Sequence, residues 1–138
     1  MEIKHLVWLR NDLRWLDNPA LYYAALEGSI RVVITATPEQ WKIHHESNAK
    51  TGLRAGLIRS LFQHLAGIGI PAELITVTDF QHIPDALESY CVTHGIQHVW
   101  FNQDIPMHEQ QRDQDVSIKL AAQGITIHPQ DSDLFVPT

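Results

Sequence analysis

The chain has 138 residues, 44% of them hydrophobic and 19% charged, which is enough for one well-buried core and too few for two ordinary domains. Its 10 lysine and arginine residues stand against 16 aspartate and glutamate residues, giving a formal net charge of −6. Nucleic-acid surfaces cluster lysine and arginine against the phosphates, so we expect this chain alone to bind DNA poorly.

The first predicted element is a buried strand over residues 3–9, followed by a charged loop at residues 10–17. A helix then begins at Asn18 and Pro19 and ends at Gly28. Asn18 can accept a hydrogen bond from the first helical turn, and the φ of Pro19 already suits a first helical position. Two interpretations of the loop charges stay open: a surface ion-pair network that shapes the crossover, or part of a functional site.

The rest of the chain continues this alternation of short apolar strands and amphipathic helices. Further strands are expected at residues 30–36, 72–79, 96–102 and 125–128, and further helices at 49–66, at 84–94 and from 106 to before Gly124. This order predicts an α/β fold with a five-stranded, parallel, doubly wound sheet of the Rossmann-like kind, with helices on both faces. Residues 1–130 are assigned to that domain and residues 131–138 to the start of an interdomain linker.

Apolar side chains within the helices predict which of their faces is buried. The helix at 49–66 is expected to bury one stripe, consisting of Leu53, Leu57, Ile58, Leu61, Phe62 and Leu65.

The single cysteine, Cys91, excludes an internal disulfide and is interpreted as a small core residue. No apolar run approaches the roughly 20 residues that span a bilayer, and the chain opens on a strand instead of a signal sequence, so we expect a cytoplasmic protein.

Three polar segments, at residues 10–17, 37–48 and 102–109, follow predicted strands. The carboxyl ends of parallel strands meet at one edge of a sheet, so these segments are expected to frame a ligand crevice there. No glycine follows the first strand, so a conventional dinucleotide site is not expected, and no sequence has the spacing of a phosphate loop. Metal-ligand spacings and a nucleophile elbow are also lacking, so we expect neither a metal site nor a catalytic residue.

The string RNDLRWLDNPAL, residues 10–21, resembles the N-terminal signature of the DNA photolyase and cryptochrome family, whose usual form is close to FRxDLRxxDNPAL. Leu9 replaces the common aromatic residue. TPEQW at 37–41, followed by His44, resembles the corresponding loop of folate-type bacterial photolyases, and the stretch at 101–116 is also similar. The resemblance runs from Leu6 to the end of the chain.

The resemblance implies the N-terminal antenna domain of a bacterial deoxyribodipyrimidine photolyase, a flavoprotein lyase of light-dependent DNA repair. Such a domain binds a light-harvesting chromophore, usually methenyltetrahydrofolate (5,10-methenyltetrahydrofolate) and otherwise a deazaflavin. The family's larger helical domain holds FAD and contacts DNA, and it is absent from these 138 residues. The resemblance therefore implies that this fragment alone is catalytically inactive, and that its partner is the helical domain of the parent chain, with no membrane contact.

Four residues are carried over from the family as cofactor-binding: Arg10, His44, His108 and Glu109. Folate-type members have an Asn-Glu pair near the pterin, so Glu109 matches and His108 departs from the pattern. A carboxylate suits a pterin, because it can accept hydrogen bonds from the amino group and a ring N–H together. The alternative hypothesis is a stand-alone α/β nucleotide-binding or docking module without photochemistry.

Overall fold

The computed structural model describes residues 3–9, 18–36, 48–77, 82–102 and 107–130, with the backbone alone at 36, 48–55 and 107–113. Strands and helices alternate throughout the described part of the chain, as the sequence predicts. Their bounds are β1 His5–Leu9, α1 Pro19–Glu27, β2 Ile30–Ala36, α3 Asn48–Gly67, β3 Ala72–Thr76, α4 Ile83–His94, β4 His98–Asn102, α5 Met107–Ala121 and β5 Thr126–Gln130.

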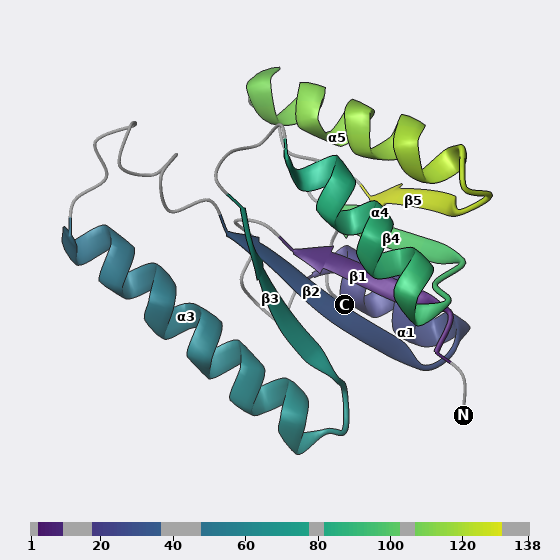
Figure 1. Ribbon diagram of the computed structural model, residues 1–138. Coiled ribbons are helices and arrows are strands. Elements are labelled where there is room, and N and C mark those ends of the chain that lie inside the picture. Colours follow the sequence, from purple (N-terminus) through teal and green to yellow (C-terminus); the bar gives the residue numbers. More distant parts are fainter. Residues whose placement is uncertain (1–2, 10–17, 37–47, 78–81, 103–106, 131–138) are drawn as a thin grey trace.

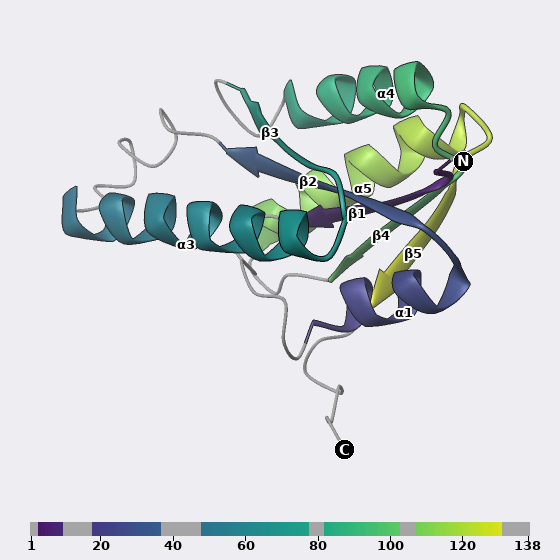
Figure 2. The ribbon, with the colours of Figure 1, turned by 90° about the horizontal axis from the view of Figure 1, so that it is seen from below.

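The five strands form one sheet in the order β3-β2-β1-β4-β5, and every neighbouring pair is parallel. Figure 2 shows three layers, with α4 and α5 on one face of the sheet and α1 and α3 on the other. Figure 1 shows the same arrangement from a direction in which α4 and α5 lie in front. The doubly wound, all-parallel α/β architecture is thereby confirmed.

Each face of the sheet packs against its own layer of helices. Alternate residues of a strand point to opposite faces, so Leu6 and Trp8 of β1 pack towards α4 and α5, while Val7 and Leu9 pack towards α1 and α3. Both sets are buried, as a central parallel strand requires. The core therefore consists of two apolar layers separated by the sheet.

The strand ends differ from the prediction at the sheet's edges. β3 stops at Thr76, short of the predicted residue 79. β5 continues through Pro129 to Gln130, past the predicted end at residue 128, and Phe101 pairs with Pro129 across β4 and β5. Proline lacks a backbone N–H and is tolerated on an edge strand, where one side of the backbone has no neighbouring strand to bind.

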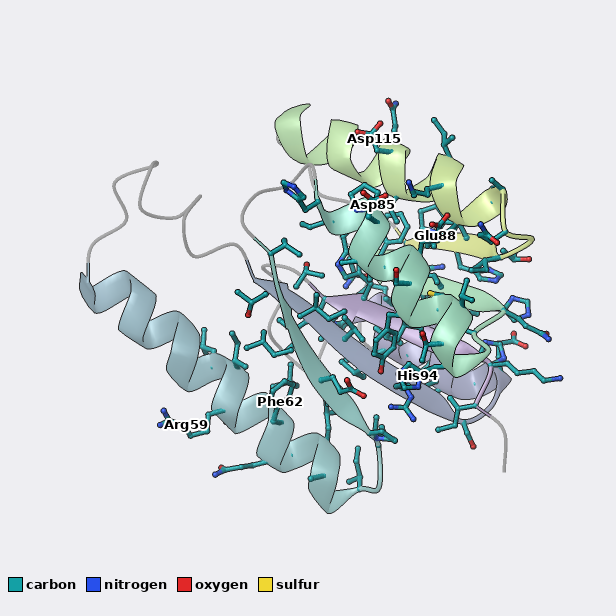
Figure 3. All side chains as sticks on the ribbon, in the orientation of Figure 1. Arg59, Phe62, Asp85, Glu88, His94 and Asp115 are labelled. Carbon is teal, nitrogen blue, oxygen red and sulfur yellow. The ribbon has the colours of Figure 1, made fainter. Side chains whose placement is uncertain are left out.

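The apolar stripe of α3 is partly wrong. Leu61 and Leu65 are buried as expected, but the side chain of Leu57 is 44% exposed. On a helix with 3.6 residues per turn, Leu57 lies nearer the border of this stripe, whereas Leu61 and Leu65 lie nearer its middle. Figure 3 shows the division farther along the helix, where Phe62 points towards β3 and Arg59 points away from the sheet.

A polar triad ties β2, β3 and α4 together. Arg31 Nη1 lies 3.1 Å from Glu73 Oε1 and donates to Tyr90 Oη at 3.3 Å, while the Tyr90 hydroxyl donates to Glu73 at 3.2 Å. Burial raises the pKa of Tyr90, so its hydroxyl is protonated at neutral pH and serves as that donor. The triad therefore joins the beginnings of β2 and β3 to each other and to α4.

Replacing Tyr90 with phenylalanine keeps the ring but removes both hydrogen bonds of the hydroxyl. We expect Tyr90→Phe to lower the free energy of unfolding by about 1 kcal/mol, the usual net value of such bonds. Urea denaturation followed by circular dichroism measures this. Tyr22→Phe on the exposed side of α1 is the matched control and is expected to change the value by less than about 0.5 kcal/mol.

Candidate functional site

The sheet order places a topological switch point between β1 and β4. From β1 the chain proceeds to β2 on one side, and from β4 it proceeds to β5 on the other. Open α/β sheets bind ligands in the crevice outside the carboxyl ends of the strands at such a point. The strands that lead into the three polar segments all end at this edge, because the sheet is parallel.

Two buried asparagines join the carboxyl end of β4 to the beginning of α1. Asn102 is the last residue of β4 and Asn18 precedes the first residue of α1, and each is only 2% exposed. Asn102 Nδ2 donates to Asn18 Oδ1 at 2.7 Å. Asn102 Oδ1 accepts from the backbone N–H of Ala20 at 3.0 Å. The pair therefore holds Asn18 and the beginning of α1 beside the end of β4.

The same two side chains occupy the hydrogen-bonding positions at the start of α1. Pro19 has no N–H, Ala20 N donates to Asn102, and Leu21 N donates to Asn18 Oδ1 at 3.3 Å. Tyr22 N begins the intrahelical pattern by donating to the carbonyl of Asn18. In dinucleotide-binding folds these N–H groups hold the pyrophosphate. Here they are already bonded within the protein, which argues against an anion at this position.

On the opposite face of the sheet, a second buried hydrogen bond lies near the same edge. Trp8 Nε1 donates to Thr35 Oγ1 at 3.0 Å, which joins β1 to β2. Both side chains are buried, and the ring of Trp8 lies 5.3 Å from that of Phe101, measured between centroids. Trp8 thus contacts groups of both neighbouring strands, β2 and β4, near the carboxyl edge of the sheet.

Of the four predicted cofactor-binding residues, the structure describes the backbone of two and nothing of the other two. Arg10 and His44 lie outside the described residues. His108 and Glu109 lie in the first turn of α5, which begins at Met107, shortly after the end of β4. Their backbone is therefore at the expected edge of the sheet, but their side chains are not described, so all four assignments stay predictions.

The sequence predicts that Asn18 caps the helix, but it does not predict that the side chain of Asn102 bonds to Asn18. The structure confirms that Asn18 caps α1 and that Pro19 occupies the first turn. The sequence places Asn102 at the end of the predicted strand 96–102 and in the family-like stretch at 101–116, but predicts no partner for its side chain. The signal that could have shown its role is an amide as the last residue of a buried strand, where a polar side chain needs a partner.

Chemistry elsewhere in the described part of the chain is limited. Burial raises the pKa of the Cys91 thiol to about 12, so it carries no thiolate at neutral pH and is confirmed as a core residue. Within the described residues, no three histidine, cysteine, aspartate or glutamate side chains are grouped so that they could hold a metal ion. Nor is any described helix both long and apolar enough to cross a membrane.

Comparison with known proteins agrees with this geometry. The family model for DNA photolyase matches residues 5–138. A deoxyribodipyrimidine photo-lyase of Vibrio cholerae is 38% identical over 121 residues, which cover 87% of this chain and 26% of that protein. Cryptochrome-2 of Arabidopsis thaliana is 33% identical over 135 residues, covering 98% of this chain and 22% of that protein. A bacterial class III photolyase from Agrobacterium tumefaciens shares the fold, with a TM-score of 0.70 at 21% identity over 95% of this chain and 26% of that one.

The chain therefore spans about a quarter of the length of these proteins, between 22% and 26%. Sequence identity above 30% with proteins of both names and a family match over nearly the whole chain agree with the RNDLRWLDNPAL signature. This chain belongs to the DNA photolyase and cryptochrome family and has the parallel α/β fold of the family's N-terminal domain.

Proposed function

We propose that this chain is the light-harvesting domain of a deoxyribodipyrimidine photolyase, which binds an antenna chromophore and takes part in light-dependent DNA repair only together with the rest of the protein. The supporting observation is the topological switch point between β1 and β4, in a chain that matches the photolyase family over residues 5–138. The repair reaction itself is assigned to a further domain.

The proposed chromophore is 5,10-methenyltetrahydrofolate, with a deazaflavin as the alternative. Glu109 lies in the first turn of α5 at the carboxyl edge, where a carboxylate could accept hydrogen bonds from the amino group and ring N–H of a pterin. Arg10, His44 and His108 are proposed to complete the set. The chromophore would supply light absorption and pass excitation energy onwards, while these residues bind and orient it.

The bonding at the start of α1 weighs against the alternative of a stand-alone nucleotide-binding module. A nucleotide held in the usual manner would place its phosphates against N–H groups that already donate to Asn18 and Asn102. A folate needs no such contact at that helix. The internal bonding of α1 therefore favours the folate proposal over an ordinary dinucleotide site.

The proposed partner is an FAD-binding helical domain of the same parent protein, acting in the cytoplasm. The relatives are about four times as long as the part that this chain matches, since coverage of them is 22% to 26%. The formal net charge of −6 agrees with DNA contact through that other domain. The sequence downstream of residue 138 in the gene tests this directly, because the proposal fails if no FAD-binding region follows.

Chromophore binding can be measured by titrating the purified chain with 5,10-methenyltetrahydrofolate and recording the near-ultraviolet absorption band. We expect Glu109→Gln to weaken binding by about 10- to 100-fold, since a hydrogen bond to a charged group contributes about 1.5–3 kcal/mol. Glu88→Gln, on α4, is the matched control and should leave binding unchanged. A response to AMP or ATP but to neither folate nor deazaflavin would instead support the nucleotide-binding alternative.

A further inference from the structure

Four rings from three strands meet on the face of the sheet that α1 covers, away from the candidate site. They are His5 of β1, His98 and Trp100 of β4, and His128 of β5, called here the ring quartet. His5 is the register partner of His98, and Trp100 is the register partner of His128. Both pairs are stacked, with centroid separations of 4.7 Å and 4.0 Å respectively.

Hydrogen bonds run along the two diagonals of the ring quartet. Trp100 Nε1 donates to His5 Nδ1 at 3.2 Å. Indole nitrogen only donates, so His5 Nδ1 has to be unprotonated and His5 has to be neutral for this bond to exist. The other diagonal joins His98 Nδ1 and His128 Nε2 at 3.0 Å. One of these two nitrogens has to carry a hydrogen and the other has to be bare.

These bonds limit the charge that the folded quartet can hold. His98 and His128 together can accept one extra proton, because a second would set two N–H groups against each other at 3.0 Å. His5 can accept none without losing the bond from Trp100. The folded geometry is thus compatible with at most one charged ring among the three histidines, whereas an unfolded chain charges all three in mild acid.

The residues around the ring quartet do not supply enough negative charge to stabilise more than one charged histidine. Apart from the histidines themselves, no residue of β1, β4 or β5 ionises near neutral pH, and the only acidic or basic residue of α1 is Glu27 at its end. Burial and the neighbouring histidines lower the pKa of both His5 and His128, while Glu27 acts in the opposite direction. One carboxylate opposes three imidazoles in a half-buried cluster.

We propose that the ring quartet is a pH-sensitive set of contacts between β1, β4 and β5. Its hydrogen bonds stabilise the sheet at neutral pH, and protonation of its histidines destabilises the fold in mild acid. The quartet lies where β1 and β4 begin, the opposite edge from the proposed chromophore site. Its response to pH does not depend on whether that site binds a folate.

The sign and size of the effect follow from proton counting. The unfolded chain binds more protons than the folded chain, so stability is full above the unfolded histidine pKa of about 6.5 and is lost as the pH falls through it. Each histidine that the fold keeps neutral raises the unfolding equilibrium constant about tenfold between pH 7.5 and 5.5. For the two protons that the ring quartet excludes, we expect about a hundredfold.

The test is urea denaturation of the purified chain at pH 7.5 and 5.5, together with nitrogen chemical shifts of its histidine rings. We expect the hundredfold rise, and at least two of the three rings neutral in the folded chain at pH 5.5. The double variant His5→Gln/His128→Gln keeps groups that can donate and accept hydrogen bonds but cannot be charged, so it should lose most of the pH response. His64→Gln/His82→Gln removes two helix-associated histidines and should retain it.

The ring shifts of the unaltered chain decide the matter even if the quartet variant fails to fold. If all three rings become charged in the folded protein with ordinary midpoints, the proposal is wrong. It is equally wrong if the quartet variant and the helix control respond to pH by the same factor as the unaltered chain.

Discussion

Replacing Asn102 with alanine is expected to lower the free energy of unfolding by about 2–4 kcal/mol. The substitution removes two buried hydrogen bonds and leaves the Ala20 N–H and the Asn18 side chain each without the bond that Asn102 supplies. A buried polar group that loses its partner costs about 1–3 kcal/mol, well above the net value of the bond itself. Urea denaturation at pH 7.5 measures the change.

Two further variants separate this effect from the loss of any amide. Gln123→Ala removes an exposed amide that donates to Glu88 and is expected to cost less than about 0.5 kcal/mol. Asn18→Ala removes the other half of the pair, and the double variant should cost less than the sum, because both single changes abolish one shared bond. Equal losses for Asn102→Ala and Gln123→Ala would contradict the assigned role.

Truncating Trp8 to alanine is expected to have the largest effect of any change considered, about 3–5 kcal/mol, because it empties a fully buried site in the middle of the sheet. Small domains have about 5–15 kcal/mol in total, so this variant should be close to unfolding at 37 °C. Thermal denaturation followed by circular dichroism shows the shift of the midpoint.

The polar part of the Trp8 contribution can be measured separately. Trp8→Phe keeps an aromatic ring but removes the N–H that donates to Thr35, and we expect a loss of about 1–3 kcal/mol. Thr35→Val removes the acceptor, and combining the two changes should cost less than their sum. Thr76→Val, at the exposed end of β3, is the control for the threonine change. Strict additivity of Trp8→Phe and Thr35→Val would show that the bond contributes nothing.

The sequence predicted those elements whose signals are local. Asn18 and Pro19 mark the start of α1, and Gly95 ends α4 with a φ of 69°, a left-handed conformation that glycine adopts without strain. β-branched runs gave the strands, and their alternation with helices gave the parallel sheet. The ends of β3 and β5 were less predictable, because an edge strand ends where its neighbour stops pairing with it.

The position of the candidate site in the fold could be predicted, but the side-chain contacts that shape it could not. The carboxyl edge follows from the parallel sheet, whereas the partnership of Asn18 and Asn102 joins residues 84 positions apart. The three histidines of the ring quartet fall in three different predicted strands, at residues 3–9, 96–102 and 125–128. Bringing them together requires the strand register, and a slip of one residue would turn each side chain to the other face.

The central position of β1 has a consequence for how the chain folds. β1 pairs with β2, which follows it closely, and with β4, which comes almost a hundred residues later along the chain. At usual rates of synthesis, on the order of ten seconds pass between their appearance, and during that time one edge of β1 has no strand to pair with. Pairing of distant segments also slows folding after release. The docking of β4 is therefore the step at which aggregation through the exposed edge of β1 competes with folding.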